Sequence, residues 1–170
     1  YVAQAFYDLY VATGNKADLE MARKINDENL PRFAEFTRYV LSLSPSARSL
    51  IGYDLDNLEF LASAIALQNR IDILSAIEAS GDPDGLRETW APRTSYDLHP
   101  VASQLIYVHG YKLPELVAEF DRSTGSSRMI LATAIATLRA AQKVGIDPME
   151  STRKVLDQYG IDLEQWSNLL

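Results

Sequence analysis

The sequence predicts an all-α fold, and three observations carry that prediction. Apolar residues recur at intervals of three and four rather than two, which is typical of amphipathic helices and not of strands. The eight glycines fall between these periodic segments or at their ends. Several of the seven prolines stand where a helix would begin. We therefore expect a bundle of about 8–10 helices with short connections capped by Gly, Pro and Asp.

The length of 170 residues fits one domain, residues 1–170, because a single core of this size buries roughly two thirds of the unfolded surface. Hydrophobic residues make up 47% of the chain, as in globular rather than disordered proteins. There is no cysteine, which excludes disulfides, zinc–thiolate sites and cysteine nucleophiles. Because secreted domains of this size often carry disulfides, a cytoplasmic protein is expected.

The charge and hydropathy patterns bear on the class of partner. The formal net charge is −7, and between Asp54 and Trp90 eight acidic residues stand against two arginines. An acidic surface repels phosphate backbones, so nucleic acid is not the expected partner. The most apolar run, residues 129–138, is half as long as the roughly 20 residues of a membrane span, so it predicts a core helix and no membrane association.

Five helices are predicted in the first half of the chain, at residues 2–13, 16–29, 32–43, 45–51 and 56–80. Gly14 and Gly52 would end the first and fourth of them. Pro31 is expected to break or kink the chain between the second and the third. Asp56 with Glu59 has the spacing of a capping box, which predicts the start of the long fifth helix.

The second half opens with a Gly-Asp-Pro-Asp-Gly turn at residues 81–85 and a nonperiodic stretch at residues 90–99. Further helices are predicted at residues 100–109, 114–123, 127–143 and 148–158, and from residue 163 onward. The 127–143 helix is apolar on almost every side and rich in small residues. We expect it at the centre of the bundle or in a subunit interface.

The tripeptide Gly-Ile-Asp occurs at residues 145–147 and again at 160–162. Each glycine would end a helix, because glycine adopts the left-handed conformation without steric cost. Each aspartate would then cap the next helix. In the first copy, Pro148 fits the first helical position and Glu150 would complete a capping box. The helix that follows is expected to pack Met149, Val155 and Leu156 inward.

Residues 139–158 also resemble a degenerate helix-turn-helix of DNA-binding proteins. Ala141 and Gly145 are four residues apart, as in the Ala-x-x-x-Gly of that motif, and its recognition helix would begin at Pro148. The resemblance implies DNA contacts from that helix. However, Ser151 stands where the motif has an apolar core residue, and the helix has as many acidic as basic residues. The preferred interpretation is therefore that these residues end one helix and cap the next.

The segment LRAAQKVGID, residues 138–147, resembles part of the all-helical nucleotide pyrophosphatases. That resemblance would imply magnesium held by carboxylates at Glu-x-x-Glu and Glu-x-x-Asp spacing. The corresponding positions here are Ala and Thr, so the metal ligands are missing. His99 and His109 are ten residues apart, too far to bind one metal from a straight helix. No cofactor and no metal is expected.

The densest group of chemically able side chains outside the predicted helices lies in the nonperiodic stretch. It comprises Trp90, Arg93, Tyr96, Asp97 and His99. An aromatic ring, a guanidinium, a carboxylate and an imidazole would suit an anionic or aromatic ligand, and an Asp–His pair could act as a base. The alternative is that the aromatic residues of this loop cover an edge of the core.

No catalytic motif stands out, since the phosphate-binding loop, the GxSxG elbow and the HExxH zinc motif are all missing. The preferred hypothesis is therefore a soluble domain that binds a protein partner or a second copy of itself. The second hypothesis is an enzyme or ligand-binding protein that uses the 90–99 loop. The third is DNA binding through residues 139–158.

Overall fold

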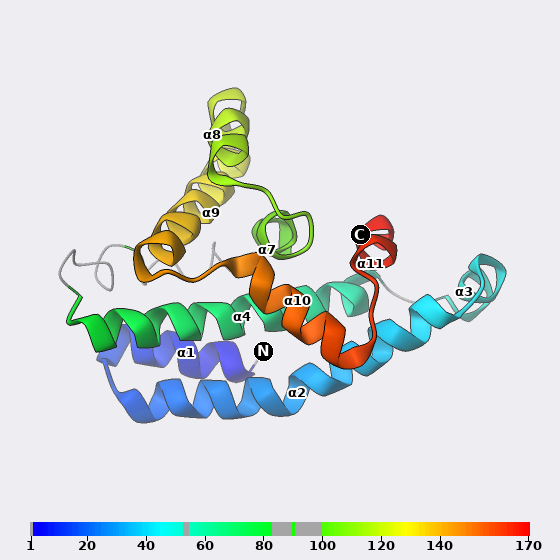
Figure 1. Ribbon diagram of the computed structural model, residues 1–170, viewed down its shortest axis with the longest axis horizontal. Coiled ribbons are helices and arrows are strands. Elements are labelled where there is room, and N and C mark those ends of the chain that lie inside the picture. Colours follow the sequence, from blue (N-terminus) through cyan, green and yellow to red (C-terminus); the bar gives the residue numbers. More distant parts are fainter. Residues whose placement is uncertain (1, 53–54, 83–89, 91–99) are drawn as a thin grey trace.

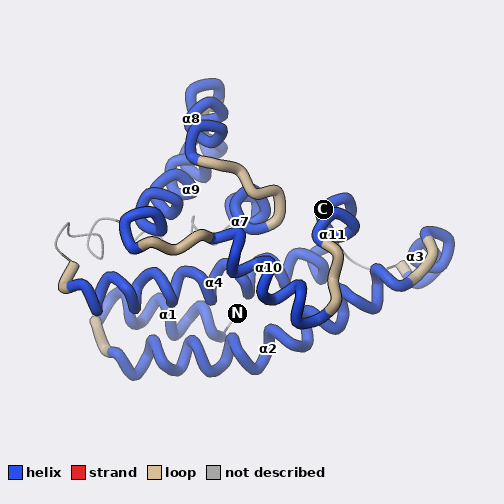
Figure 2. Tube along the Cα trace, viewed as in Figure 1, coloured by secondary structure: helices blue, strands red, loops and turns tan. Residues whose placement is uncertain are grey.

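The computed structural model describes residues 2–52, 55–82, 90 and 100–170. In this part of the chain it contains nine helices and no strand, which confirms the all-α prediction (Figures 1 and 2). The helices are α1 Val2–Thr13, α2 Lys16–Ser42, α3 Pro45–Ile51, α4 Leu55–Ser80, α7 Pro100–Tyr107, α8 Leu113–Arg122, α9 Gly125–Val144, α10 Pro148–Tyr159 and α11 Leu163–Leu169.

Helix α4 forms the centre of the bundle. It packs against α2 on one side and against α7, α9 and α10 on the other (Figure 1). Its side chains are buried in almost every direction, with Leu61, Ile65 and Ile73 among those fully enclosed. Helix α1 lies along α2 and reaches α4 through its tyrosines.

The expectation that the 127–143 helix is central is wrong. This segment belongs to α9, which buries one face. The first residues of α9, from Gly125 to Met129, are exposed. Its buried side chains are mainly Ala and Thr, which remove little apolar surface from water, whereas α4 buries Leu and Ile along its length. The larger apolar area therefore occupies the centre.

Helix α2 continues through Pro31, so of the two predicted alternatives, a break or a kink, the break is wrong. The proline removes one backbone hydrogen bond, the one that a residue at position 31 would donate to the carbonyl of Asp27. Packing offsets this loss, because one buried stripe runs along both sides of the proline and faces α4. The stripe consists of Leu19, Ala22, Asn26, Leu30, Ala34, Thr37 and Val40.

The ends of the helices near α4 combine local and long-range contacts. Ser44 caps α3 by accepting a hydrogen bond from the Ala47 amide at 3.2 Å, and Gly52 ends that helix in the left-handed conformation. Helix α4 begins at Leu55, one residue before the predicted cap Asp56, whose side chain lies outside the described residues. Glu59 accepts a hydrogen bond from Gln104 Nε2 at 3.1 Å and so joins α4 to α7.

Both Gly-Ile-Asp copies form the same kind of turn, which confirms that they end one helix and begin the next. Gly145 and Gly160 have φ of 74° and 66°. The isoleucine amide then bonds back to the helix that has just ended, from Ile146 to the Ala141 carbonyl and from Ile161 to the Leu156 carbonyl, both at 2.9 Å. These are the hydrogen bonds of a Schellman motif, which satisfies carbonyls at a helix end.

The aspartate of each copy begins the next helix. Asp147 Oδ1 accepts a hydrogen bond from the Met149 amide at 3.0 Å, and Asp162 Oδ1 accepts one from the Glu164 amide at 3.3 Å. Within the described residues, no bond from Glu150 returns to Asp147, so only half of the predicted box forms. The side chains of Met149, Val155 and Leu156 are buried, as predicted.

One described helix is long and apolar enough to cross a membrane, the Leu58–Ser80 part of α4. Within its most apolar window, 67% of the residues are buried inside the fold, as in the core helix of a bundle. Helices α9 and α10 pass the same test only when they are taken together, and they are bent by 87° at the first Gly-Ile-Asp turn.

Replacing the cap of α10 tests this account. Asp147→Ala should lower the free energy of unfolding by about 1 kcal/mol, because the Met149 amide loses its acceptor. Asp157→Ala is a matched control, since it removes an exposed carboxylate from the last turn of the same helix. Urea denaturation monitored by circular dichroism measures both, and equal effects of the two substitutions would contradict a capping role.

Candidate functional site

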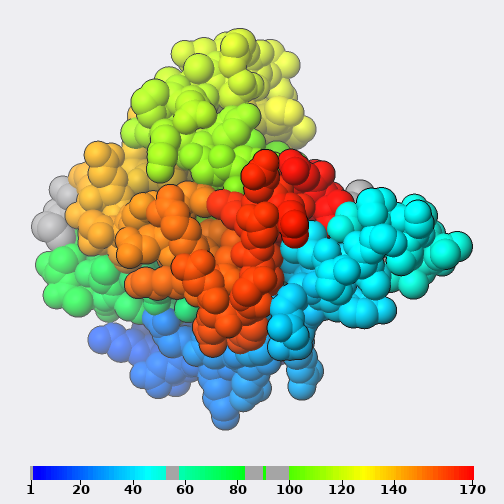
Figure 3. Space-filling model, turned by 45° about the vertical axis from the view of Figure 1, so that its right-hand side comes forward, coloured from blue at the N-terminus to red at the C-terminus, as the bar shows by residue number. Residues whose placement is uncertain are grey.

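Helices α8 and α9 form a hairpin that projects from the rest of the bundle (Figures 1 and 3). The two-residue connection Ser123–Thr124 joins them, and α8 packs mainly against α9. The upper part of the molecule in Figure 3 consists largely of this hairpin and the chain that leads into it. Among the described helices, α9 joins the hairpin to both α4 and α7.

The amphipathic pattern of α8 explains how the hairpin closes. Leu116 is buried against α9, while Val117 and Phe120 are half-buried beside it. The Arg128 guanidinium of α9 lies 4.2 Å from the centre of the Phe120 ring, an attraction between a cation and the face of an aromatic ring. Glu115 accepts a hydrogen bond from the Lys112 amide at 3.1 Å and satisfies a free donor at the start of α8.

A groove with a cavity volume of about 550 Å³ lies between the two helices of the hairpin and Trp90. We call it the hairpin groove. Alanines on α9 leave open the space between Val117 and Phe120 of α8 and Ile135 of α9 that larger residues would fill. The groove is lined by Trp90, Val117, Phe120, Asp121, Ala132, Ile135, Ala136, Arg139, Ala140 and Lys143.

The charge at the hairpin groove differs from that of the whole chain. Helix α9 carries three basic residues, Arg128, Arg139 and Lys143, and no acidic one, although the chain has a net charge of −7. Arg139 and Lys143 are four residues apart and therefore lie on the same face of the helix, at the groove. Among the described residues that line it, Asp121 is the single acidic one. In the described part of the chain, the groove thus combines an apolar floor with two basic side chains and one acidic side chain.

Trp90 connects the groove to the core. It is 2% exposed, and the Arg70 guanidinium lies 3.9 Å from the centre of its ring. Its Nε1 donates a hydrogen bond to the Thr137 hydroxyl of α9 at 3.1 Å. Because Trp90 contacts both α4 and α9, it fixes how the base of the hairpin sits on the central helix.

Arg70 is the other half of this connection and is 1% exposed. Its Nε donates to the Tyr7 hydroxyl of α1, its Nη1 to the Thr137 hydroxyl at 3.4 Å, and its Nη2 to the Trp90 carbonyl at 3.3 Å. The guanidinium also lies 5.5 Å from the centre of the Tyr7 ring. A buried cation is stable only when its donors are satisfied, so these acceptors hold Arg70 in place.

Asn69, the neighbour of Arg70, makes a second set of buried contacts on the other side of α4. Its Nδ2 donates to the Ser151 hydroxyl of α10 at 3.0 Å, and its Oδ1 accepts from the Tyr107 hydroxyl of α7 at 2.7 Å. The Thr152 hydroxyl in turn donates to the Tyr107 carbonyl at 2.7 Å. These bonds align α7 and α10, which form the floor beneath the hairpin.

The structure places one of the five predicted ligand-binding residues. Trp90 is buried and lines the hairpin groove, whereas Arg93, Tyr96, Asp97 and His99 lie outside the described residues. Sequence reasoning missed the part played by Arg70. The signal was available, because a polar run at positions 68–70 interrupts the apolar stripe of the predicted helix.

In the part of the chain that the structure describes, no three His, Asp or Glu side chains lie close enough together to hold a metal ion. Comparisons with protein-family models, with curated proteins and with solved structures give no match to the chain.

Replacing Arg70 tests its structural role. Arg70→Met keeps much of the side-chain volume but removes the donors of three bonds, so it should destabilise the fold by at least about 2 kcal/mol. Arg70→Lys keeps the charge but not the planar fork, and should recover only part of that loss. Urea unfolding followed by tryptophan fluorescence measures both. Full stability of Arg70→Lys would show that the charge alone matters.

The carboxyl of Asp8 offers a test by pH. Its partial burial raises its pKa above the ordinary 3.8, and the nearby Arg70 guanidinium opposes this shift. A raised pKa means that the ionised form destabilises the folded state at neutral pH, and that this penalty disappears as pH falls below 3.8. Asp8→Asn should therefore raise the melting temperature at pH 7 more than at pH 3.5. A gain that grows toward low pH would contradict this assignment.

Proposed function

We propose that this protein acts by binding a helical segment of a partner protein in the hairpin groove. The observation that carries the proposal is the groove itself, an apolar channel on a hairpin that projects from the bundle. An amphipathic helix commonly binds in such a channel by placing its apolar face on the floor. The missing cysteines and the net negative charge suit a protein that works in the cytoplasm.

The dimensions of the groove suit a short helix. The α9 residues that line it run from Ala132 to Lys143, which corresponds to about 17 Å along the helix axis. A partner helix of three to four turns would match this length. The alanines at positions 132, 136 and 140 would allow its backbone to come close to α9.

The charge of the rim defines the chemistry of the partner segment. The Arg139 guanidinium at the rim favours acidic side chains beside the apolar stripe of the bound helix. We therefore propose an acidic amphipathic helix, with apolar residues three and four positions apart and Asp or Glu on the flanks. Such a helix lies mostly over an open groove, so weak and reversible binding is expected.

A display library of 16-residue helical peptides, selected on the immobilised protein, tests this proposal. We expect enrichment of peptides with an apolar stripe and acidic flanks. A labelled synthetic copy of an enriched peptide should bind more weakly as salt increases, because screening reduces the attraction to the rim. Fluorescence anisotropy measures the affinity at each salt concentration.

Three variants complete the test. Ala136→Glu places a carboxylate on the groove floor and should abolish peptide binding, and Arg139→Glu should weaken it by about tenfold or more. Lys154→Glu makes the same charge change on an exposed face of α10 and should bind as the parent does. Equal binding by all variants, or selection of basic peptides, would refute the proposal. Sedimentation that shows a dimer disrupted by Ala136→Glu would instead identify a second copy as the occupant.

A further inference from the structure

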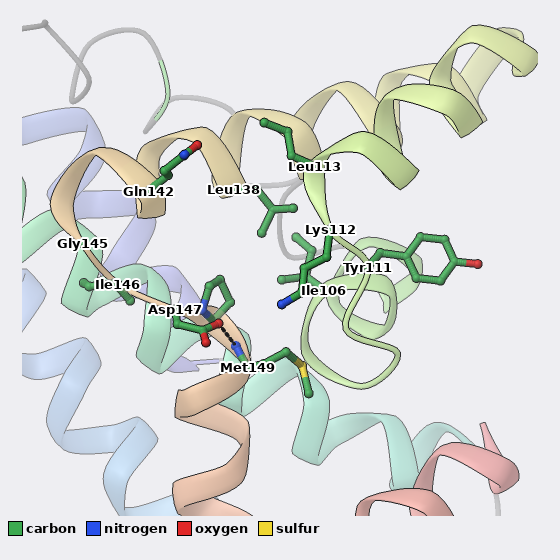
Figure 4. Close-up of a pocket in the computed structure, with 11 residues that line it drawn as sticks. Ile106, Tyr111, Lys112, Leu113, Leu138, Gln142, Gly145, Ile146, Asp147 and Met149 are labelled. Atoms are coloured by element: carbon green, nitrogen blue, oxygen red, sulfur yellow. Dashed lines mark hydrogen bonds between the residues drawn. The ribbon is translucent and has the colours of Figure 1, made fainter.

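A second hollow, separate from the hairpin groove, lies where α7, α8, α9 and α10 meet (Figure 4). We call it the junction hollow. Its cavity volume is about 440 Å³, within the range of about 300–1,000 Å³ that is typical of small-molecule sites. It is lined by Ile106, Tyr111, Lys112, Leu113, Leu138, Gln142, Gly145, Ile146, Asp147, Pro148 and Met149.

Two turns form opposite walls of the junction hollow. On one side α7 ends in a turn in which the His109 amide bonds to the Gln104 carbonyl at 2.9 Å. Gly110, with φ of 66°, then brings the chain against α10, where a Cβ at this position would lie 3.5 Å from the Met149 side chain. On the other side stands the Gly145–Asp147 turn. Both walls are therefore built by local bonds and do not depend on a ligand.

The floor of the junction hollow is hydrocarbon. Ile106 and Met149 are buried, and Leu113, Leu138 and Ile146 are half-buried around the same space. Figure 4 shows these side chains coming from different elements around one opening, while the Tyr111 ring points away from it. Such a floor favours the apolar body of a small molecule, because covering it removes apolar surface from water.

The charge available at the mouth is positive. The Lys112 side chain extends toward the hollow (Figure 4), and among the described residues no carboxylate lies within ion-pair distance of its ammonium. The acidic residue of the mouth is already engaged, because Asp147 Oδ1 caps α10 and its Oδ2 lies 3.9 Å from Arg153 Nη1. Lys112 is thus the charged group of the mouth that a ligand would meet.

We infer that the junction hollow binds a small monocarboxylate with an apolar body, such as a medium-chain fatty acid. The hydrocarbon would cover Ile106, Leu138 and Met149, and the carboxylate would pair with the Lys112 ammonium. An amine of the same length would be repelled by Lys112, and an alcohol would lack the ionic contact. This site is distinct from the hairpin groove and goes beyond the proposed function.

The ε-methyl group of Met149 reports on this site in an NMR titration. With methionines labelled at that methyl group, octanoate below its micelle concentration should shift the Met149 signal in a saturable manner. Met21 and Met129 are half-exposed on other parts of the surface and serve as internal references. Octanol should bind about fivefold more weakly than octanoate, and octylamine more weakly still.

Substitution of the lysine gives the matched control. Lys112→Gln should weaken octanoate binding by about fivefold and leave octanol binding unchanged, whereas Lys154→Gln, on α10 away from the hollow, should change neither. Melting curves show whether each variant keeps its fold. Octanoate that leaves the Met149 signal unmoved would overturn the inference. So would equal affinities for octanoate, octanol and octylamine, or an affinity for octanoate that Lys112→Gln does not reduce.

Discussion

The architecture depends on the burial of two adjacent polar side chains, Asn69 and Arg70, in the middle of the most enclosed helix. A buried polar group that loses its partner costs about 1–3 kcal/mol, so the surrounding helices must present oxygen atoms at fixed positions. Tyr7 of α1, Thr137 of α9, Tyr107 of α7 and Ser151 of α10 meet that requirement, together with the Trp90 carbonyl. Apolar packing alone tolerates a helix that rotates or slides, whereas these directional bonds do not. The pair therefore selects one arrangement among several that would bury similar apolar area.

The same constraint explains where the two candidate sites lie. Helix α9 is tied to the centre through Thr137, near the middle of its length, while its first turns and the whole of α8 extend beyond that attachment. The hairpin groove opens beside this attachment, since its α9 residues run from Ala132 to Lys143 on both sides of Thr137, and Trp90 lines it next to the core. The junction hollow lies at the base of the hairpin, between turns whose own hydrogen bonds hold them apart. Both concavities are thus produced by the way in which the hairpin is attached.

The sequence predicted the helix ends better than the arrangement of the helices. Gly14, Ser44, Asp147 and Gly160 act through bonds to residues a few positions away, and such signals are visible in a single chain. The break predicted at Pro31 is wrong because the burial of one stripe of α2 against α4 outweighs the loss of one backbone hydrogen bond. The prediction placed the 127–143 helix at the centre because that segment is rich in apolar residues. Most of these are small and bury less area than the Leu and Ile side chains of α4. The hairpin groove could not be foreseen, since a concavity depends on how α8 and α9 pack. Of the predicted ligand-binding loop, Trp90 alone lies in the described residues, and the rest stays a prediction.

The two Gly-Ile-Asp turns have a consequence for how the chain reaches this structure. Every bond that shapes them joins residues at most five positions apart, so neither turn needs a distant partner to form. The bend of 87° between α9 and α10 is in that sense a local property of the chain. Turns that form locally reduce the number of conformations that the chain must search during folding, because closing a short loop loses little entropy. Helices α9 and α10 can thus take their relative directions early in folding. Asn69 and Arg70 of α4 then form hydrogen bonds to two helices whose connecting turn already exists.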